Sequence, residues 1–337
     1  MCTGIDTDAE VSLNGQPVLN ARNMHRTFLL DVKALLRGSG NTLVVAFTGP
    51  VPASLAAKAA CGAANGGFCG DGACVCPAPW PGPSNNQLLI NAFIRKEQQS
   101  FAWDFAPATG TTALMVKPHV VGYDAALLRD VVVDTRPVVS PPGSSSSSSS
   151  GGWTVAISAR LWSALGPPPG ASAAALTASF DGLGVGASAA MVVGPGETVS
   201  TLNITVPASA EVDTWWPNGY GGQALYPLTL TLVTATVAGG QEQQNKTVLV
   251  GFRTIAIEQP ALPPGNGDGH RYQFVVNGVR IYARGSNWVP SQSLQTRVTA
   301  RQLRRHFEAY RAAHFTNLRV WGGGVYASDV CDLTESF

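Results

Sequence analysis

The stretch Glu10-Val-Ser-Leu-Asn14-Gly15 decides how this chain begins to fold. Val11 and Leu13 alternate with polar residues, and this period of two is typical of a half-buried strand. An Asn-Gly pair follows at once, and both residues tolerate the positive φ angles that a two-residue hairpin turn requires. The stretch therefore predicts a β-hairpin. Further short apolar runs at 27–30 and 42–47 extend the prediction to a β-sandwich.

The segment that follows, residues 49–86, is rich in proline, glycine, alanine and cysteine and shows little periodicity. This composition predicts a long loop or insertion. Four of the six cysteines fall within it, at Cys61, Cys69, Cys74 and Cys76. Cys74-Val-Cys76 is one residue short of the Cys-x-x-Cys spacing of zinc sites, and no histidine lies nearby, so the pattern favours disulfides over a metal site. Strands are predicted to resume at 88–95 and 113–121.

A proline-rich stretch and the unbroken serine run 144–150 predict a domain boundary, because such a composition cannot bury apolar surface. We therefore place a first domain at 1–137 and a second at 138–259, with a serine-rich loop at 140–152. Short strand candidates separated by turn residues recur through the second domain, at 153–158, 175–180, 198–206, 225–236 and 247–257. Regular short strands over about 100 residues predict an immunoglobulin-like β-sandwich.

The pattern changes again from residue 260 onward. A second Asn-Gly pair predicts a hairpin over 274–282, and the spacing of apolar residues predicts a helix over 299–313 with Thr299 as its N-cap. A strand at 317–321 and a second helix beginning near Ser328 follow. A parallel α/β barrel begins with strands and helices that alternate and are joined by short links. Residues 260–337 are therefore predicted to begin such a barrel.

The amino-acid composition limits the classes of molecule that the chain is expected to bind. Its 22 Lys and Arg residues are balanced by 21 Asp and Glu residues, which makes nucleic acid and anionic membranes unlikely partners and favours a neutral ligand. No run of about 18 apolar residues predicts a membrane-spanning helix. The first residues lack the pattern of a secretory signal. The sequons Asn203-Ile-Thr and Asn245-Lys-Thr are nevertheless compatible with a lysosomal or secretory route.

Four parts of the chain carry longer motifs. They are Gly4-Ile-Asp-Thr-Asp-Ala-Glu-Val-Ser-Leu-Asn-Gly15, Arg95-Lys-Glu-Gln-Gln-Ser-Phe-Ala-Trp-Asp-Phe-Ala-Pro107, Trp215-Trp-Pro-Asn-Gly-Tyr-Gly221, and Ala283-Arg-Gly-Ser-Asn-Trp-Val-Pro290 with Asn317-Leu-Arg-Val-Trp-Gly-Gly-Gly324. In this order they resemble the β-mannosidases of glycoside hydrolase family 2, particularly the animal lysosomal type. Phe105-Ala106 departs from the family's Trp-Gly at that point.

The resemblance implies a multidomain, mainly β protein. It consists of a partial jelly-roll sandwich of the galactose-binding type, an immunoglobulin-like β-sandwich, and the first strands and helices of a (β/α)8 TIM barrel. The implied activity is the release of terminal β-mannose with retention, from β-mannosides and N-glycan-derived oligosaccharides, without cofactor or metal. Two other hypotheses remain open: a non-catalytic carbohydrate-binding protein, and a related exo-glucosaminidase or mannosylglycoprotein endo-mannosidase.

The resemblance also implies a set of substrate-binding residues. These are Trp103, Asp104, Asn287, Trp288, Arg319 and Trp321. Aromatic faces cover the apolar C–H patches of a sugar ring, and polar side chains satisfy its hydroxyl groups, so the residue types suit the task. The last four would lie at the carboxyl ends of barrel strands, where barrel enzymes carry their active sites. A purely structural role is the alternative for two of these residues: Trp103 would be a core residue of the sandwich, and Trp321 would belong to a simple turn. Trp215 and Trp216 are assigned mainly to domain packing.

A retaining glycosidase needs two carboxyl groups about 5–5.5 Å apart. The resemblance places both catalytic glutamates on the fourth and seventh barrel strands, whereas residues 260–337 are expected to supply only the first two strands. No residue of this chain is therefore assigned a catalytic role, including Asp332 and Glu335, and the chain alone is expected to be inactive. The resemblance also implies further jelly-roll strands before Gly4.

Overall fold

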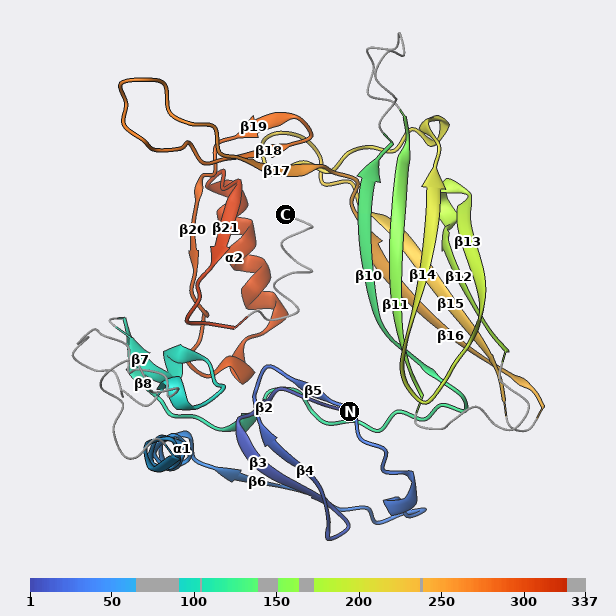
Figure 1. Ribbon diagram of the computed structural model, residues 1–337, viewed down its shortest axis with the longest axis vertical. Coiled ribbons are helices and arrows are strands. Elements are labelled where there is room, and N and C mark those ends of the chain that lie inside the picture. Colours follow the sequence, from blue (N-terminus) through green and yellow to red (C-terminus); the bar gives the residue numbers. More distant parts are fainter. Residues whose placement is uncertain (65–90, 104, 139–150, 164–172, 237–238, 326–337) are drawn as a thin grey trace. The chain divides into compact units, whose positions relative to one another are not determined.

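The computed structural model describes residues 1–64, 91–103, 105–138, 151–163, 173–236 and 239–325. These residues form two compact units. The first holds Met1–Val121, Asn287–Arg304 and the segment that begins at Arg319, and the second holds Gly122–Ser286 and Arg305–Leu318. Both units are mainly β, as the sequence predicted (Figure 1).

Short strands dominate the first unit. They are β1 (Cys2–Thr3), β2 (Ile5–Asp6), β3 (Asp8–Leu13), β4 (Gln16–Arg22), β5 (Thr27–Phe28), β6 (Leu43–Thr48), β7 (Phe101–Trp103), β8 (Ala106–Ala108) and β9 (Ala113–Leu114). Strands β4, β3 and β6 form one antiparallel sheet, and β1 pairs with β5, β2 with β9 and β7 with β8. The core of this part contains Cys2, Ile5, Ala9, Val11 and Ala21.

The hairpin predicted at Asn14-Gly15 is confirmed. Asn14 has φ 51° and Gly15 has φ 83°, and the turn joins β3 to β4. The Asn14 side chain also accepts a hydrogen bond from the Thr42 backbone N–H at 2.9 Å. This bond ties the turn to the chain that enters β6, so one residue sets both the turn and the position of the third strand.

The segments after this sheet differ from the prediction. Residues 50–64 form helix α1 (Pro50–Ala64), so a loop was the wrong prediction there. Its alanines favour helix without an amphipathic pattern, and prolines are tolerated in its first turn. Residues 91–93 form a 3-10 turn instead of a strand, and the strand predicted at 113–121 is limited to β9. Cys61 is disulfide-bonded, while Cys69, Cys74 and Cys76 lie outside the described residues.

The second unit contains a sandwich of two antiparallel sheets (Figure 1). Its strands are β10 (Leu127–Pro137), β11 (Trp153–Ser163), β12 (Ala173–Phe180), β13 (Val185–Val192), β14 (Gly196–Val206), β15 (Tyr226–Ala235) and β16 (Gln241–Val250). One sheet has the order β10-β11-β14 and the other β13-β12-β15-β16. Alternate side chains of both sheets enter one shared core, which is why these strands read as apolar–polar repeats.

The domain boundary predicted at 137/138 is displaced. Strand β10 pairs along its length with β11, so residues 127–137 belong to the second unit, which begins at Gly122. The serine run lies outside the described residues. Composition alone therefore put the border too late, because the apolar pattern of residues 127–137 does not tell which of two sheets the strand joins.

After the sandwich come β17 (Ile255–Glu258), β18 (Gln273–Val276) and β19 (Val279–Ile281), which form a small antiparallel sheet. The predicted Asn277-Gly278 turn joins β18 to β19, with φ angles of 49° and 77°. The chain continues through β20 (Gly285–Trp288), helix α2 (Ala300–Ala312) and β21 (Asn317–Val320), and β20 pairs with β21. The predicted strand–helix–strand order is therefore present; the second helix near Ser328 lies outside the described residues.

Helix α2 begins as predicted. The Gln302 backbone N–H donates to Thr299 Oγ1 at 3.3 Å, and the Thr299 backbone N–H donates to Gln302 Oε1 at 3.0 Å, a reciprocal capping arrangement. Leu303 and Phe307 are buried on one face of the helix. Within the described ranges, neither α1 nor α2 is long and apolar enough to cross a membrane.

Candidate functional site

The first unit contains five of the six predicted substrate-binding residues. Trp103 ends β7, Asn287 and Trp288 end β20, and Arg319 and Trp321 lie at the end of β21. Asp104 lies outside the described residues. Three segments that are distant in sequence therefore meet in one compact unit.

An aromatic cluster lies at the centre of this site. The Trp103 and Trp321 ring centroids are 5.2 Å apart at an interplanar angle of 69°, and Phe105 approaches Trp321 at 5.3 Å and 65°. Such edge-to-face contacts are the favoured geometry of aromatic pairs. Phe105 was not among the predicted site residues, although it lies in the same motif as Trp103. Its side chain is 54% exposed, so it adds an accessible apolar surface to the cluster.

Backbone geometry brings the rings together. Ala102 has φ 80°, a conformation that residues with a Cβ atom rarely adopt, and it lies directly before Trp103. On the other side, the Trp321 ring folds back over Gly323: a Cβ atom there would lie 2.1 Å from the ring. Gly323 therefore leaves the space that the Trp321 ring occupies, which any residue with a Cβ atom would fill.

A polar pair lies beside the aromatic cluster along the two strands. Arg319 Nη1 donates a hydrogen bond to Asn287 Oδ1 at 2.9 Å, and both residues are exposed. The neighbouring strand positions are joined by the Trp321 N–H, which donates to the Trp288 carbonyl at 3.0 Å. Trp288 itself is only 4% exposed, so it offers little surface to a ligand.

Buried charged groups underlie the site, and sequence reasoning missed them. The Lys96 ammonium group forms an ion pair with Asp6, and both side chains are almost fully buried. Glu97 is 4% exposed; its carboxylate accepts hydrogen bonds from Ser100 Oγ at 3.0 Å and from the Gln295 side-chain amide. The available signal was the Lys96-Glu97 pair itself, which directly follows the strand predicted at 88–95.

The Glu97 carboxyl group has a raised pKa. Burial is the main cause, Lys96 and the Ser100 hydroxyl group act in the opposite direction, and the nearby Asp6 carboxylate raises the pKa further. Because the folded state binds this proton more tightly than the unfolded chain, the contribution of Glu97 to stability is full below the ordinary glutamate pKa. It is lost as pH rises through the raised value.

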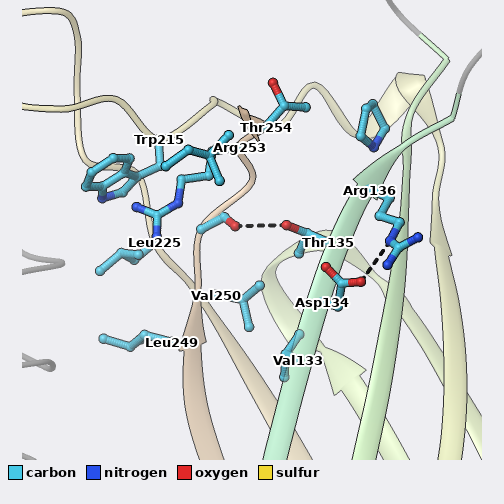
Figure 2. Close-up of a pocket in the computed structure, with 13 residues that line it drawn as sticks. Val133, Asp134, Thr135, Arg136, Trp215, Leu225, Leu249, Val250, Arg253 and Thr254 are labelled. Atoms are coloured by element: carbon cyan, nitrogen blue, oxygen red, sulfur yellow. Dashed lines mark hydrogen bonds and ion pairs between the residues drawn. The ribbon is translucent and has the colours of Figure 1, made fainter. Parts of the chain in front are cut away.

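No group of three or more metal-ligating side chains suited to hold a metal ion occurs among the described residues. A cavity of about 500 Å³ lies in the second unit, and none of the predicted site residues lines it. Figure 2 shows Arg253 over the ring of Trp215, at 4.2 Å, on one side of this cavity, and Arg136 paired with Asp134 on the other. The Trp215 backbone carbonyl also accepts a hydrogen bond from the Asn277 side-chain amide at 3.0 Å.

Comparison with known proteins adds a family and several relatives. Residues 1–115 match the family described as glycosyl hydrolase 2 galactose-binding domain-like. The β-mannosidase of Capra hircus is 29% identical and β-mannosidase A of Aspergillus aculeatus is 28% identical, each over 98% of this chain and 35% of the relative. The chain thus spans about a third of the length of these relatives.

Two solved structures share the fold. The β-D-mannosidase of Dictyoglomus thermophilum superposes with a TM-score of 0.77 at 24% identity, over 99% of this chain and 36% of that chain. An exo-chitosanase of Amycolatopsis orientalis superposes with a TM-score of 0.61 at 14% identity, over 99% of this chain and 32% of that chain. At these identities the likeness concerns the fold alone.

Proposed function

We propose that this chain, whose residues 1–115 carry the galactose-binding-like domain of glycosyl hydrolase family 2, is the substrate-positioning part of a β-mannosidase. Its substrate class is a terminal, non-reducing β-D-mannose residue of a β-mannoside or an N-glycan-derived oligosaccharide. In this proposal the seven strands β10 to β16 are the immunoglobulin-like domain, and β20, α2 and β21 begin the TIM barrel.

One observation carries the proposal. Trp321 and the Arg319–Asn287 pair lie near the ends of the paired strands β20 and β21, and Trp103 and Phe105 contact the Trp321 ring from another segment of the same unit. The apolar face of a pyranose fits against exposed aromatic rings, and its hydroxyl groups match an amide and a guanidinium group. In the proposed complete site Arg319 also holds the nucleophilic carboxylate, as the family resemblance implies.

The proposed mechanism is retaining hydrolysis through a covalent glycosyl-enzyme intermediate, with one carboxyl group as nucleophile and a second as acid and base. We assign neither carboxyl group to these 337 residues. In this proposal the chain positions the sugar, and the two catalytic carboxyl groups lie on later strands of the barrel. A lysosomal or secretory location is part of the proposal, and Asn203 and Asn245 are exposed on β14 and β16, as glycan attachment would require.

We expect the 337-residue chain to bind methyl β-D-mannoside, as measured by isothermal titration calorimetry. Replacing Trp321 with alanine removes the ring that Trp103 and Phe105 share, and affinity is expected to fall by about tenfold or more, since a factor of ten corresponds to about 1.4 kcal/mol. Trp162→Phe in the second unit is the matched control. Equal affinity of the Trp321→Ala and Trp162→Phe variants would contradict the proposed site. Tighter binding of a β-glucosaminide than of the β-mannoside would show that the preferred sugar is glucosamine instead of mannose.

The same chain is expected to show no turnover of an aryl β-mannoside, because its site holds the sugar without the two catalytic carboxyl groups. The measurement is release of the phenol over the acidic and neutral pH range. Retaining hydrolysis that disappears in Glu335→Gln would disprove this assignment, because it would place a catalytic carboxyl group within the chain.

A further inference from the structure

We propose that Glu97 is a positioning residue that holds the two tryptophans of the sugar site at their working distance, and this proposal rests on the proposed function. Its carboxylate lies between two segments that are far apart in sequence. Ser100 donates to one oxygen, and Gln295, which is 198 residues away, donates to the other. Glu97 thus fastens the Trp103 segment to the segment that follows β20.

A second contact continues this connection to Trp321. The Gln99 N–H, two residues after Glu97, donates at 3.0 Å to the Gly323 carbonyl, in the turn over which the Trp321 ring folds. The segment 97–103 is therefore held at Gln295 and at Gly323 before it presents the Trp103 ring. Loss of the Glu97 contact frees one of these two anchors.

The chemistry of the contact explains why a carboxylate stands there. Ser100 and Gln295 each donate to a different oxygen of the Glu97 carboxyl group, whereas a side-chain amide has only one acceptor oxygen. The other charged groups around Glu97 are Lys96 and Asp6, which neutralise each other as a buried pair. The Glu97 carboxyl group therefore makes its hydrogen bonds with Ser100 and Gln295 and forms no ion pair of its own among the described residues.

The first experiment measures the ring pair without any ligand. The Trp103–Trp321 pair is expected to give a near-ultraviolet circular dichroism signal, which Trp321→Phe identifies. Glu97→Ala should lose at least half of this signal and bind methyl β-D-mannoside at least tenfold more weakly, while the exposed Glu10→Ala leaves both unchanged. If Glu97→Ala keeps the signal and the affinity, the proposal is wrong.

Charge-swapped variants separate positioning from simple stability. Gln295→Glu sets two carboxyl groups against each other, so the ring signal should be present below about pH 5, where one is protonated, and lost at neutral pH. Combining it with Glu97→Gln restores a donor–acceptor pair and should restore the signal at pH 7. A double variant that stays as defective as Gln295→Glu would overturn the proposal. If the wild-type chain binds no β-mannoside, the proposed function fails while the ring signal still tests Glu97.

Discussion

Replacing Lys96 with methionine is expected to destabilise the first unit by about 3–5 kcal/mol, because the buried Asp6 carboxylate then loses the ammonium group that it is paired with. The Lys96 and Asp6 side chains are 0% and 2% exposed, so water cannot replace the lost ammonium group. Methionine keeps nearly the same length and shape, and the loss is therefore electrostatic. Amide hydrogen exchange of β2 and β3 measures the free energy of opening in this unit alone.

The control is Lys117→Met, which makes the same change at an exposed position and should cost less than about 0.5 kcal/mol. Adding Asp6→Asn to Lys96→Met removes the uncompensated charge and should recover part of the loss, because replacing both partners of a buried pair is far less costly than removing one. A loss below about 1 kcal/mol in Lys96→Met, which is the usual size for an exposed ion pair, would mean that the pair does not hold the unit together.

Replacing Phe252 with alanine is expected to destabilise the second unit by about 3–5 kcal/mol, the usual range for a buried phenylalanine. Phe252 is fully buried, and its ring meets those of Trp153, Phe180 and Tyr226 at centroid distances of 5.4, 5.8 and 5.4 Å. These partners come from both sheets of the sandwich, so the cavity would open between the layers. Urea unfolding followed by hydrogen exchange of β12 and β15 reports the change.

Two matched variants sharpen this measurement. Phe252→Leu keeps most of the volume and should cost about 1.5 kcal/mol or less. Val132→Ala truncates a side chain of the same unit that is 57% exposed, and it should lie within about 0.5 kcal/mol of the wild type. If all three variants have equal stability, the aromatic ring is not a central element of the sandwich core.

Local features of the fold were predictable because a few neighbouring residues decide them. The hairpins at Asn14-Gly15 and Asn277-Gly278 need only positive φ angles, and the Thr299 cap needs only a partner three residues later. Helix α1 was missed because its evidence is alanine content without a period, a weaker signal than the prolines around it. The border at residue 137 was displaced because proline and serine content was the only local signal, whereas the pairing of β10 with β11 is decided by the folded sheet.

The sequence by itself determined the candidate site residues: Trp103, Asn287, Arg319 and Trp321 were predicted from motifs that can be read within single segments. Only the tertiary structure decided that Phe105 joins the cluster and that Trp288 is buried. It also brought Glu97 against Gln295, 198 residues away, and Lys96 against Asp6, 90 residues away. Hydrogen-bond and charge complementarity between distant residues leaves no local period, so only the folded chain shows which donor meets which acceptor.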